Sequence, residues 1–317
     1  MPPIRFIHAA DLHLDAAFSG LSRDIPADFA ERLRTATFTA FRRLLDLCER
    51  ESPDFLLLAG DVYNQEDASV SAQLALRDGF RRLESLSIPV FLVHGNHDPL
   101  ASRLRSVRWP GNVTVFGELP DAVPVFRKGE GTPLAIIHGA SHASGRETRN
   151  LAALFRRTEA CGLHVGLLHA TPGDADGVAR YAPFSQEDLK ASGMDYWALG
   201  HIHHPQLIPE DDPAIAFSGC IQGRDIHETG PHGVLKVTLR ENLPTEVAFL
   251  PTAQIVWERI EVDVSACATI ADIQEAITTQ QFERNARSQC QNMLCRITLT
   301  GATPLHSALT SHVLADL

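Results

Sequence analysis

The sequence predicts an α/β fold of two packed mixed β-sheets flanked by helices. Three observations lead to this prediction. Short apolar runs bounded by turn residues recur along the first two thirds of the chain, as is typical of strands buried on both faces. Between these runs, apolar residues recur at the helical spacing of three and four, so strands and helices alternate. Beyond about residue 205, short strands follow one another with turn residues between most of them, which fits mixed sheets with helices outside.

The expected elements follow the hydrophobic pattern in order along the chain. Residues 26–50 should form an amphipathic helix, because Phe29, Leu33 and Ala36 begin a helical spacing just after Pro26, a residue that suits a first turn. A second helix is expected over residues 68–86. The expected strands cover residues 4–8, 55–59, 89–93, 165–168, 196–200, 206–208, 215–217, 233–239, 246–250 and 255–262.

A domain boundary is expected near residue 264, which divides the chain into domains at 1–264 and 265–317. The last helix of the second domain reaches the final residue without a stop signal, so we interpret this domain as cut short or reduced. Its expected elements are a helix at about 269–285, a strand at 292–299, and a helix that starts at Thr303 and Pro304 and carries Leu305, Leu309 and Val313 at four-residue spacing.

Side chains suited to metal binding stand at the carboxyl ends of several expected strands. Two divalent ions about 3.5 to 4 Å apart, which clamp the attacking and leaving oxygens of a displacement, need oxygen and imidazole ligands with one bridging carboxylate. Asp, His and Asn supply such ligands. The candidate ligands are Asp11, His13, Asp61, Asn96, His169, His201 and His203.

The spacing of these residues suggests how they share two ions. Asp11 and His13 are two residues apart on an extended segment, so their side chains share a face and can bind one ion together. The glycine before Asp61 allows a close backbone turn, so Asp61 projects at the end of the sheet as the bridging carboxylate. His201 and His203 lie about 6.6 Å apart along extended chain, which lets them serve neighbouring ions.

The segment 92–98 adds a catalyst to the ligands. Asn96 offers a neutral carbonyl oxygen as a ligand, whereas the next side chain, His97, points elsewhere, toward the substrate. Any one of these residues alone would more often be structural. All of them together, at strand ends in one chain, favour a binuclear metal site.

The order Asp-x-His, Gly-Asp, Gly-Asn-His-Asp, His and Gly-His-x-His resembles the calcineurin-like metallophosphoesterase superfamily. The resemblance covers residues 1 to about 240, and implies a four-layer αββα sandwich followed by the start of a small C-terminal α/β cap. Five segments resemble the YhaO-like branch of SbcD-type DNA repair exonucleases in particular: residues 6–15, 181–184, 195–203, 222–224 and 228–231.

The resemblance also implies a role for each site residue. The two ions would usually be manganese. His97 resembles the catalytic histidine of the family, which is either a general acid for the leaving oxygen or a stabiliser of the charged transition state, and Asp98 would hold its loop in place. The implied ligands are Asp11, His13, Asp61 and His203 for one ion and Asp61, Asn96, His169 and His201 for the other.

One position departs from the family pattern. Three residues after Asp61 the superfamily commonly has an Asp or His that supports the catalytic histidine, whereas this chain has Asn64. Asn64 would hold the His97 imidazole by a hydrogen bond but adds no negative charge, so the imidazolium form would be favoured less. Alternatively, Asn64 is a turn residue of the loop 64–67 and points at solvent.

The composition is that of a soluble globular protein. Of 317 residues, 44% are hydrophobic, no apolar run approaches the roughly 18 residues of a membrane span, and the first residues lack a secretory signal. We therefore expect a cytoplasmic protein without membrane contact. The net charge of −11 argues against a generally basic nucleic-acid-binding surface, although two bound cations would place positive charge where phosphates dock.

Three functions are compatible with these residues. The first is a manganese-dependent DNA exonuclease or phosphodiesterase of DNA repair, in which two metal ions activate water and His97 assists the leaving sugar oxygen. The second is a phosphatase or cyclic-nucleotide phosphodiesterase on the same site, which is opposed by Gln65, where protein phosphatases carry a phosphate-binding Arg. The third is a scaffold without chemistry, which is opposed by the complete ligand set.

The resemblance implies DNA as a partner. It also implies an SbcC-like coiled-coil ATPase. The chain has no Gly-rich phosphate loop of its own, so an ATP-dependent function would need a partner. SbcD-type nucleases tend to dimerise, so a homodimer is expected by analogy alone.

Overall fold

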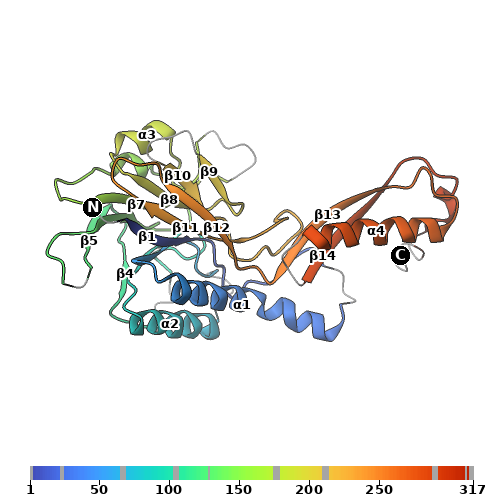
Figure 1. Cartoon of the computed structure of the whole chain (residues 1–317), viewed down its shortest axis with the longest axis horizontal. Helices are drawn as coiled ribbons and strands as arrows, with labels where there is room; N and C mark the ends of the chain where they lie inside the picture. Colours follow the sequence, from blue (N-terminus) through green and yellow to red (C-terminus); the bar gives the residue numbers. More distant parts are fainter. Residues whose placement is uncertain are drawn as a thin grey trace.

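The two expected mixed sheets are present, with helices outside them (Figure 1). The computed structural model describes residues 3–21, 25–64, 69–102, 107–127, 129–173, 179–208, 214–287, 292–310 and 313. Over these residues, the strands form two six-stranded sheets and a separate two-stranded sheet. The predicted α/β fold class is therefore confirmed.

The first sheet consists, in spatial order, of β12 (Glu246–Pro251), β11 (Gly233–Leu239), β1 (Ile4–Ala9), β2 (Phe55–Ala59), β3 (Val90–Val93) and β4 (Val113–Val115). Strands β1 to β4 run parallel, and β11 and β12 extend the β1 edge in antiparallel pairs. Every residue of β2 and β3 is buried, because both faces of a parallel sheet are covered and the strands are apolar throughout.

The second sheet consists, in spatial order, of β5 (Asp121–Val125), β6 (Ala135–Ala140), β7 (Leu163–His169), β8 (Tyr196–Gly200), β10 (Ala214–Phe217) and β9 (Gln206–Ile208). The four inner strands run parallel, and the edge strands β5 and β9 are antiparallel. We did not predict β4, β5 or β6. Strand β4 is short and half-buried, and Pro124 interrupts the β5 pattern, which a sheet tolerates at an edge because proline has no N–H to donate.

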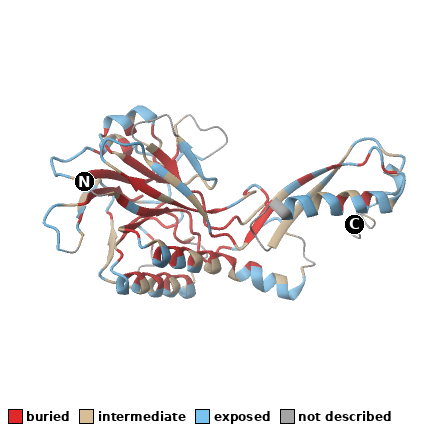
Figure 2. Cartoon of the chain, in the orientation of Figure 1, coloured by how far each residue is buried: buried red, intermediate tan, exposed pale blue. Residues whose placement is uncertain are grey.

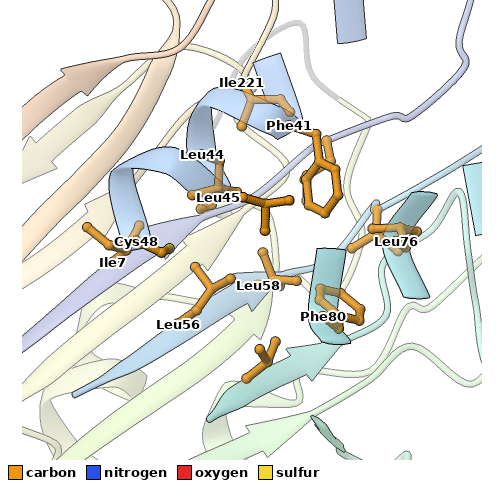
Figure 3. Close-up of a cluster of buried hydrophobic side chains, with 14 of the residues drawn as sticks. Ile7, Phe41, Leu44, Leu45, Cys48, Leu56, Leu58, Leu76, Phe80 and Ile221 are labelled. Carbon is orange, nitrogen blue, oxygen red and sulfur yellow. The ribbon is translucent and has the colours of Figure 1, made fainter. Parts of the chain in front are cut away.

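Two helices cover the outer face of the first sheet, close to their predicted ranges: α1 (Ala27–Glu51) and α2 (Val70–Ser85). Figure 3 shows Leu44 of α1 and Phe80 of α2 beside Leu56 and Leu58 of β2. The neighbouring residue Phe55 belongs instead to the core between the two sheets. Successive side chains of a strand point to opposite faces, so β2 supplies both cores.

The second sheet is covered on its outer face by α3 (Gln186–Ala191) and the 3-10 helix η1 (Ala152–Leu154). Trp197 of β8 packs there with Phe155 and Leu189 in a third core. The layers are therefore helix, sheet, sheet and helix, and Figure 2 shows buried strands between half-exposed helices. Among the described helices, none has the length and apolar character needed to span a membrane.

A separate β-α-β unit follows β12 and projects from the sheets (Figure 1). It consists of β13 (Ile255–Asp263), α4 (Ile270–Arg287) and β14 (Asn292–Thr300). Strand β13 pairs with β14 in parallel along its whole length and joins neither large sheet. The sheet pairing thus changes between β12 and β13, whereas the predicted boundary at residue 264 lies after β13.

The helix predicted from Thr303 is wrong over residues 303–310. A 3-10 turn, η2 (His306–Ala308), forms there, and Leu309 leaves helical geometry with ψ of 65°, whereas Val313 is helical as predicted. Leu305 and Leu309 pack against the small core of the β-α-β unit. Their four-residue spacing thus reflects the packing of one turn, because core contacts can produce a helical period without a helix. Residues 311–312 and 314–317 lie outside the described residues.

Candidate metal centre

The predicted site residues gather where both sheets present the carboxyl ends of parallel strands. Because parallel strands end at the same edge of a sheet, residues distant in sequence meet there. Hydrogen bonds between loops hold the ends together, such as that from the backbone N–H of Asp11 to the carbonyl of Gly60 at 3.0 Å. Asp11 and His13 follow β1, Asp61 follows β2, Asn96, His97 and Asp98 follow β3, His169 ends β7, and His201 and His203 follow β8.

Four of these residues have left-handed backbone angles, which side-chain-bearing residues rarely adopt. The φ angles are 51° at Asp11, 40° at His13, 52° at Asp61 and 95° at His201. Such conformations cost roughly 1–3 kcal/mol each and persist where the surroundings impose them, commonly at functional sites. Close approach adds a further constraint, because a Cβ at Gly95 would lie only 2.3 Å from Oδ1 of Asp61.

The carboxylates of Asp11 and Asp61 lie at the middle of the cluster, and each residue is 1% exposed. Oδ2 of Asp61 lies 3.4 Å from Nε2 of His169 and 3.9 Å from Nε2 of His13, so Asp61 stands between imidazoles of the two sheets. Oδ1 of Asp11 lies 3.7 Å from Nε2 of His203. Burial raises the pKa of Asp11 to about 6, and burial with the nearby Asp98 and Asp11 carboxyls raises the pKa of Asp61 well above its usual range.

Each of the four imidazoles has one nitrogen engaged by an oxygen acceptor, which leaves the other nitrogen with a lone pair. Nδ1 of His13 donates to Oδ1 of Asn64 at 2.6 Å, and Nδ1 of His169 donates to the carbonyl of Ala59 at 2.9 Å. Two further contacts have the same form: Nδ1 of His203 to Oε1 of Glu228 at 2.5 Å, and Nε2 of His201 to the carbonyl of Ala179 at 3.1 Å. Hydrogen bonds of this kind orient metal-binding histidines.

The protonation states of three of these four imidazoles suit metal binding as well. Burial lowers the pKa of His13 and His169 well below the ordinary value, and lowers that of His201 to about 4. These imidazoles are therefore neutral near pH 7, which is the form that binds metals. At His203 burial also acts to lower the pKa, but the hydrogen bond to Glu228 and the charge of Asp11 outweigh it, so the pKa is raised.

The free lone pairs face one another, which is why the residues fit cations. Nε2 of His13 lies 3.3 Å from Nε2 of His203, and Nε2 of His169 lies 3.0 Å from Oδ1 of Asn96. With the other nitrogen of each ring donating elsewhere, the neutral rings bring acceptor against acceptor, which a cation between them would relieve; between His13 and His203, whose pKa is raised, a proton can do the same. Over the described residues, ligand atoms within 4.8 Å of one another form three groups, two of which consist of predicted ligands alone: Asp11, His13 and His203, and Asp11, Asp61 and His169.

His97 and Asp98 lie in the loop after β3 and have different surroundings. The Asp98 side chain is fully buried and accepts hydrogen bonds from the backbone N–H groups of Gly95, Asp61 and Val62 at 2.7, 3.2 and 3.0 Å. His97 is exposed, and its ring centroid lies 5.2 Å from that of His13. Asp98 thus fixes the loop, and His97 stands at the open side of the ligand cluster.

Asn64 contacts a different imidazole from the one that we predicted. Its Oδ1 holds His13, a candidate ligand, in the tautomer that directs Nε2 toward Asp61 and His203. An amide oxygen serves this purpose without negative charge, because it needs only to accept a hydrogen bond. The position of Gln65 lies outside the described residues.

The site and fold agree with comparisons to known proteins. The sequence model of the calcineurin-like phosphoesterases matches residues 4–205, more than half of the chain. The chain belongs to the calcineurin-like phosphoesterase family. It is therefore a phosphoesterase, and the family uses binuclear divalent metal sites, for which this chain offers the ligand groups described above. A second model, the middle domain of the metallophosphoesterase YhaO, matches residues 257–317.

Two curated relatives align over most of this phosphoesterase. The uncharacterised metallophosphoesterase YhaO of Bacillus subtilis (strain 168) is 36% identical over 304 residues, which cover 95% of this chain and 72% of the relative. The DNA double-strand break repair protein Mre11 of Aeropyrum pernix is 26% identical over 291 residues, which cover 83% of this chain and 64% of the relative. A solved dimetal phosphatase from Danio rerio is 13% identical with a TM-score of 0.44, over 77% of this chain and 98% of that one.

The role of Glu228 in the phosphoesterase site was missed by the sequence analysis. Glu228 holds Nδ1 of His203. Residues 228–231 had been noted only for their resemblance to the YhaO-like branch. No spacing rule could connect Glu228 to His203, because the chain between them includes the strands β9 and β10.

Proposed function

We propose that this phosphoesterase is a manganese-dependent DNA exonuclease of DNA repair. The observation that carries the proposal is the alignment with the DNA repair protein Mre11, which spans 83% of the chain and so continues past the part matched by the general family model. DNA would then be the substrate, and an SbcC-like ATPase and a second copy of the chain its proposed partners.

The residues of this chain account for hydrolysis of a phosphodiester as follows. Two divalent ions held by the Asp, His and Asn cluster would supply positive charge at the phosphate and lower the pKa of water to near neutrality. His97 is exposed beside that cluster, so its imidazole can donate a hydrogen bond or a proton to the leaving sugar oxygen. Its backbone N–H donates to Oδ1 of Asp61 at 2.9 Å, which ties the position of His97 to the candidate bridging carboxylate.

The test is release of nucleotides from end-labelled linear duplex DNA with manganese. The wild-type chain is compared with Asp61→Ala and His97→Ala, and with the surface controls Asp121→Ala and His306→Ala, which change the same residue types at exposed positions. We expect release by the wild type and both controls, and its loss in both site variants.

A second substrate separates the DNA assignment from the metal chemistry. If the wild type leaves DNA intact but hydrolyses bis(4-nitrophenyl) phosphate in an Asp61-dependent way, the phosphodiesterase assignment stands and the DNA assignment fails. Hydrolysis of a phosphomonoester or a cyclic nucleotide alone would favour the alternative function considered from the sequence.

A further inference from the structure

Arg224 is a cation beside the metal centre that the mechanism above does not use. It lies in the segment 222–230, between β10 and β11, and its side chain is 14% exposed. Its backbone N–H donates to Oε2 of Glu228 at 2.6 Å, and its Nη2 lies 3.7 Å from Oε1 of the same carboxylate. Because Oε1 also accepts from His203, a single carboxylate separates the guanidinium from a candidate metal ligand.

The Arg224 guanidinium is poorly satisfied by the protein around it. Its Nε is buried and has no hydrogen-bond partner, and 3.7 Å is too long for a hydrogen bond from Nη2 to Glu228. A guanidinium carries five N–H donors in a fixed plane, so donors remain for a ligand. Buried donors that lack partners destabilise a fold, which makes such a group a candidate for ligand binding.

The charge of Arg224 lies beside the site. Its Nη2 is 3.7 Å from Oε1 of Glu228, and the same oxygen accepts a hydrogen bond from Nδ1 of His203. Nε2 of His203 in turn lies 3.7 Å from Oδ1 of Asp11. A fixed positive charge thus lies one carboxylate away from the ligand cluster, where it can attract a bound anion.

We propose that Arg224 binds the non-bridging oxygens of the substrate phosphate at the metal centre, an inference that rests on the phosphodiesterase function proposed above. The planar guanidinium matches two oxygens of a phosphate better than a point charge does. Glu228 holds both Arg224 and His203, so one carboxylate sets the spacing between the metal ligand and the phosphate-binding cation. The competing role for Arg224 is to neutralise buried carboxylates without touching substrate.

Calorimetry on the manganese-loaded protein with inorganic phosphate as the ligand tests the proposal. The variants are Arg224→Gln and Arg224→Lys. Arg259→Gln is the matched control, because Arg259 is exposed and contacts the same loop through the carbonyl of Ile226 and Nδ1 of His227. We expect Arg224→Gln to weaken phosphate binding by about 10- to 100-fold, the range for loss of charge-assisted hydrogen bonds, with partial recovery in Arg224→Lys and no change in the control.

A manganese titration without phosphate distinguishes the two roles. Phosphate binding predicts that Arg224→Gln retains two manganese ions at nearly unchanged affinity, and that KM for bis(4-nitrophenyl) phosphate rises. Neutralisation predicts tighter manganese binding with unchanged phosphate affinity, which would overturn the proposal. Loss of manganese binding in a variant that melts like the wild type would overturn it as well, because Arg224 would then serve the metal ligands.

The binding measurements distinguish a failure of this proposal from a failure of the proposed function. If the wild type binds manganese and phosphate but hydrolyses no phosphodiester, the phosphodiesterase assignment fails, while the phosphate affinities of the Arg224 variants still decide where the anion binds.

Discussion

The large body of sheets and the projecting β-α-β unit differ in how completely they enclose their strands. In the body, β2 lies between α1 and α2 on one side and the second sheet on the other, and all its residues are buried. In the β-α-β unit, most residues of β14 are only half-buried, and the buried core is small. That core comprises Ile260, Val262, Val264, Cys267, Ile273 and Ile277.

This difference indicates which region can accommodate a site that lowers the stability of the fold. The metal centre contains buried carboxylates and left-handed backbone, both of which lower stability. A three-core body can hold such features in place, whereas a small core of six buried residues has little surplus stability.

One segment connects the two regions. The Gln222 amide donates to the carbonyl of Ile255 at 2.7 Å and accepts from the N–H of Gln254, at the start of β13. A few residues later, Gly230 donates to the carbonyl of Trp257, while Glu228 holds His203. The β-α-β unit is therefore attached to the body next to the metal centre.

The largest effect on hydrolysis is expected from Asp61→Asn. Loss of the candidate bridging carboxylate should reduce the rate by roughly 10³-fold or more, at the upper range for removal of one charge-stabilising group. In the metal-free protein the same change should raise the melting temperature, because it removes a buried carboxyl whose pKa burial raises. Calorimetry with a chelator measures this. A lower melting temperature would contradict the view that the body tolerates a destabilising site.

Asn64→Ala should have the next largest effect, a loss of manganese affinity. Without Asn64, His13 loses the acceptor that fixes its tautomer, so manganese affinity should fall by about 10- to 100-fold. Isothermal titration measures the affinity, with Asn64→Asp as the conservative control that keeps an acceptor oxygen. Equal affinities of the wild type and Asn64→Ala would show that the hydrogen bond to Asn64 does not matter.

Ile273→Ala should lower the stability of the β-α-β unit without lowering that of the body. Ile273 is fully buried in α4, so its truncation should destabilise the β-α-β unit by about 2–5 kcal/mol. Hydrogen exchange should show loss of protection in β14 with little change in β1 to β3. Hydrolysis of bis(4-nitrophenyl) phosphate should stay within about twofold of wild type. Leu76→Ala, a matched truncation in α2, should destabilise the body instead, and equal effects in both regions would mean that they unfold together.

Among these variants, His138→Gln is expected to change the free energy of unfolding least at neutral pH. Burial and the neighbouring His164 lower the pKa of His138 from 6.5 to about 4, so between these values the unfolded chain binds more protons than the folded body. The contribution of His138 to the free energy of unfolding is therefore at its full value above pH 6.5 and is lost as the pH falls toward 4. Urea unfolding at pH 7 and pH 5 should show a smaller difference in the variant. The exposed control His306→Gln should behave like the wild type, and an unchanged pH dependence in His138→Gln would refute the assignment.

Much of the fold and most of the candidate site could be predicted from local pattern. The apolar runs at 55–59 and 196–200 coincide with β2 and β8, because a strand buried on both faces needs an unbroken apolar sequence. The short edge strand β5, with Pro124, could not be predicted in this way. Its pairing depends on β6 rather than on its own composition.

The sequence by itself determined the positions of most strands along the chain and the choice of candidate metal-binding side chains, because hydrophobic periodicity and two-residue spacing act within a few residues of the chain. Only the tertiary structure decided which side chain supports which. Asn64 forms a hydrogen bond with His13, 51 residues away in the sequence. Glu228 forms one with His203, and two strands lie between these residues in the sequence. Such contacts form when separate strand ends meet at one edge of the sheets, and no local spacing specifies them.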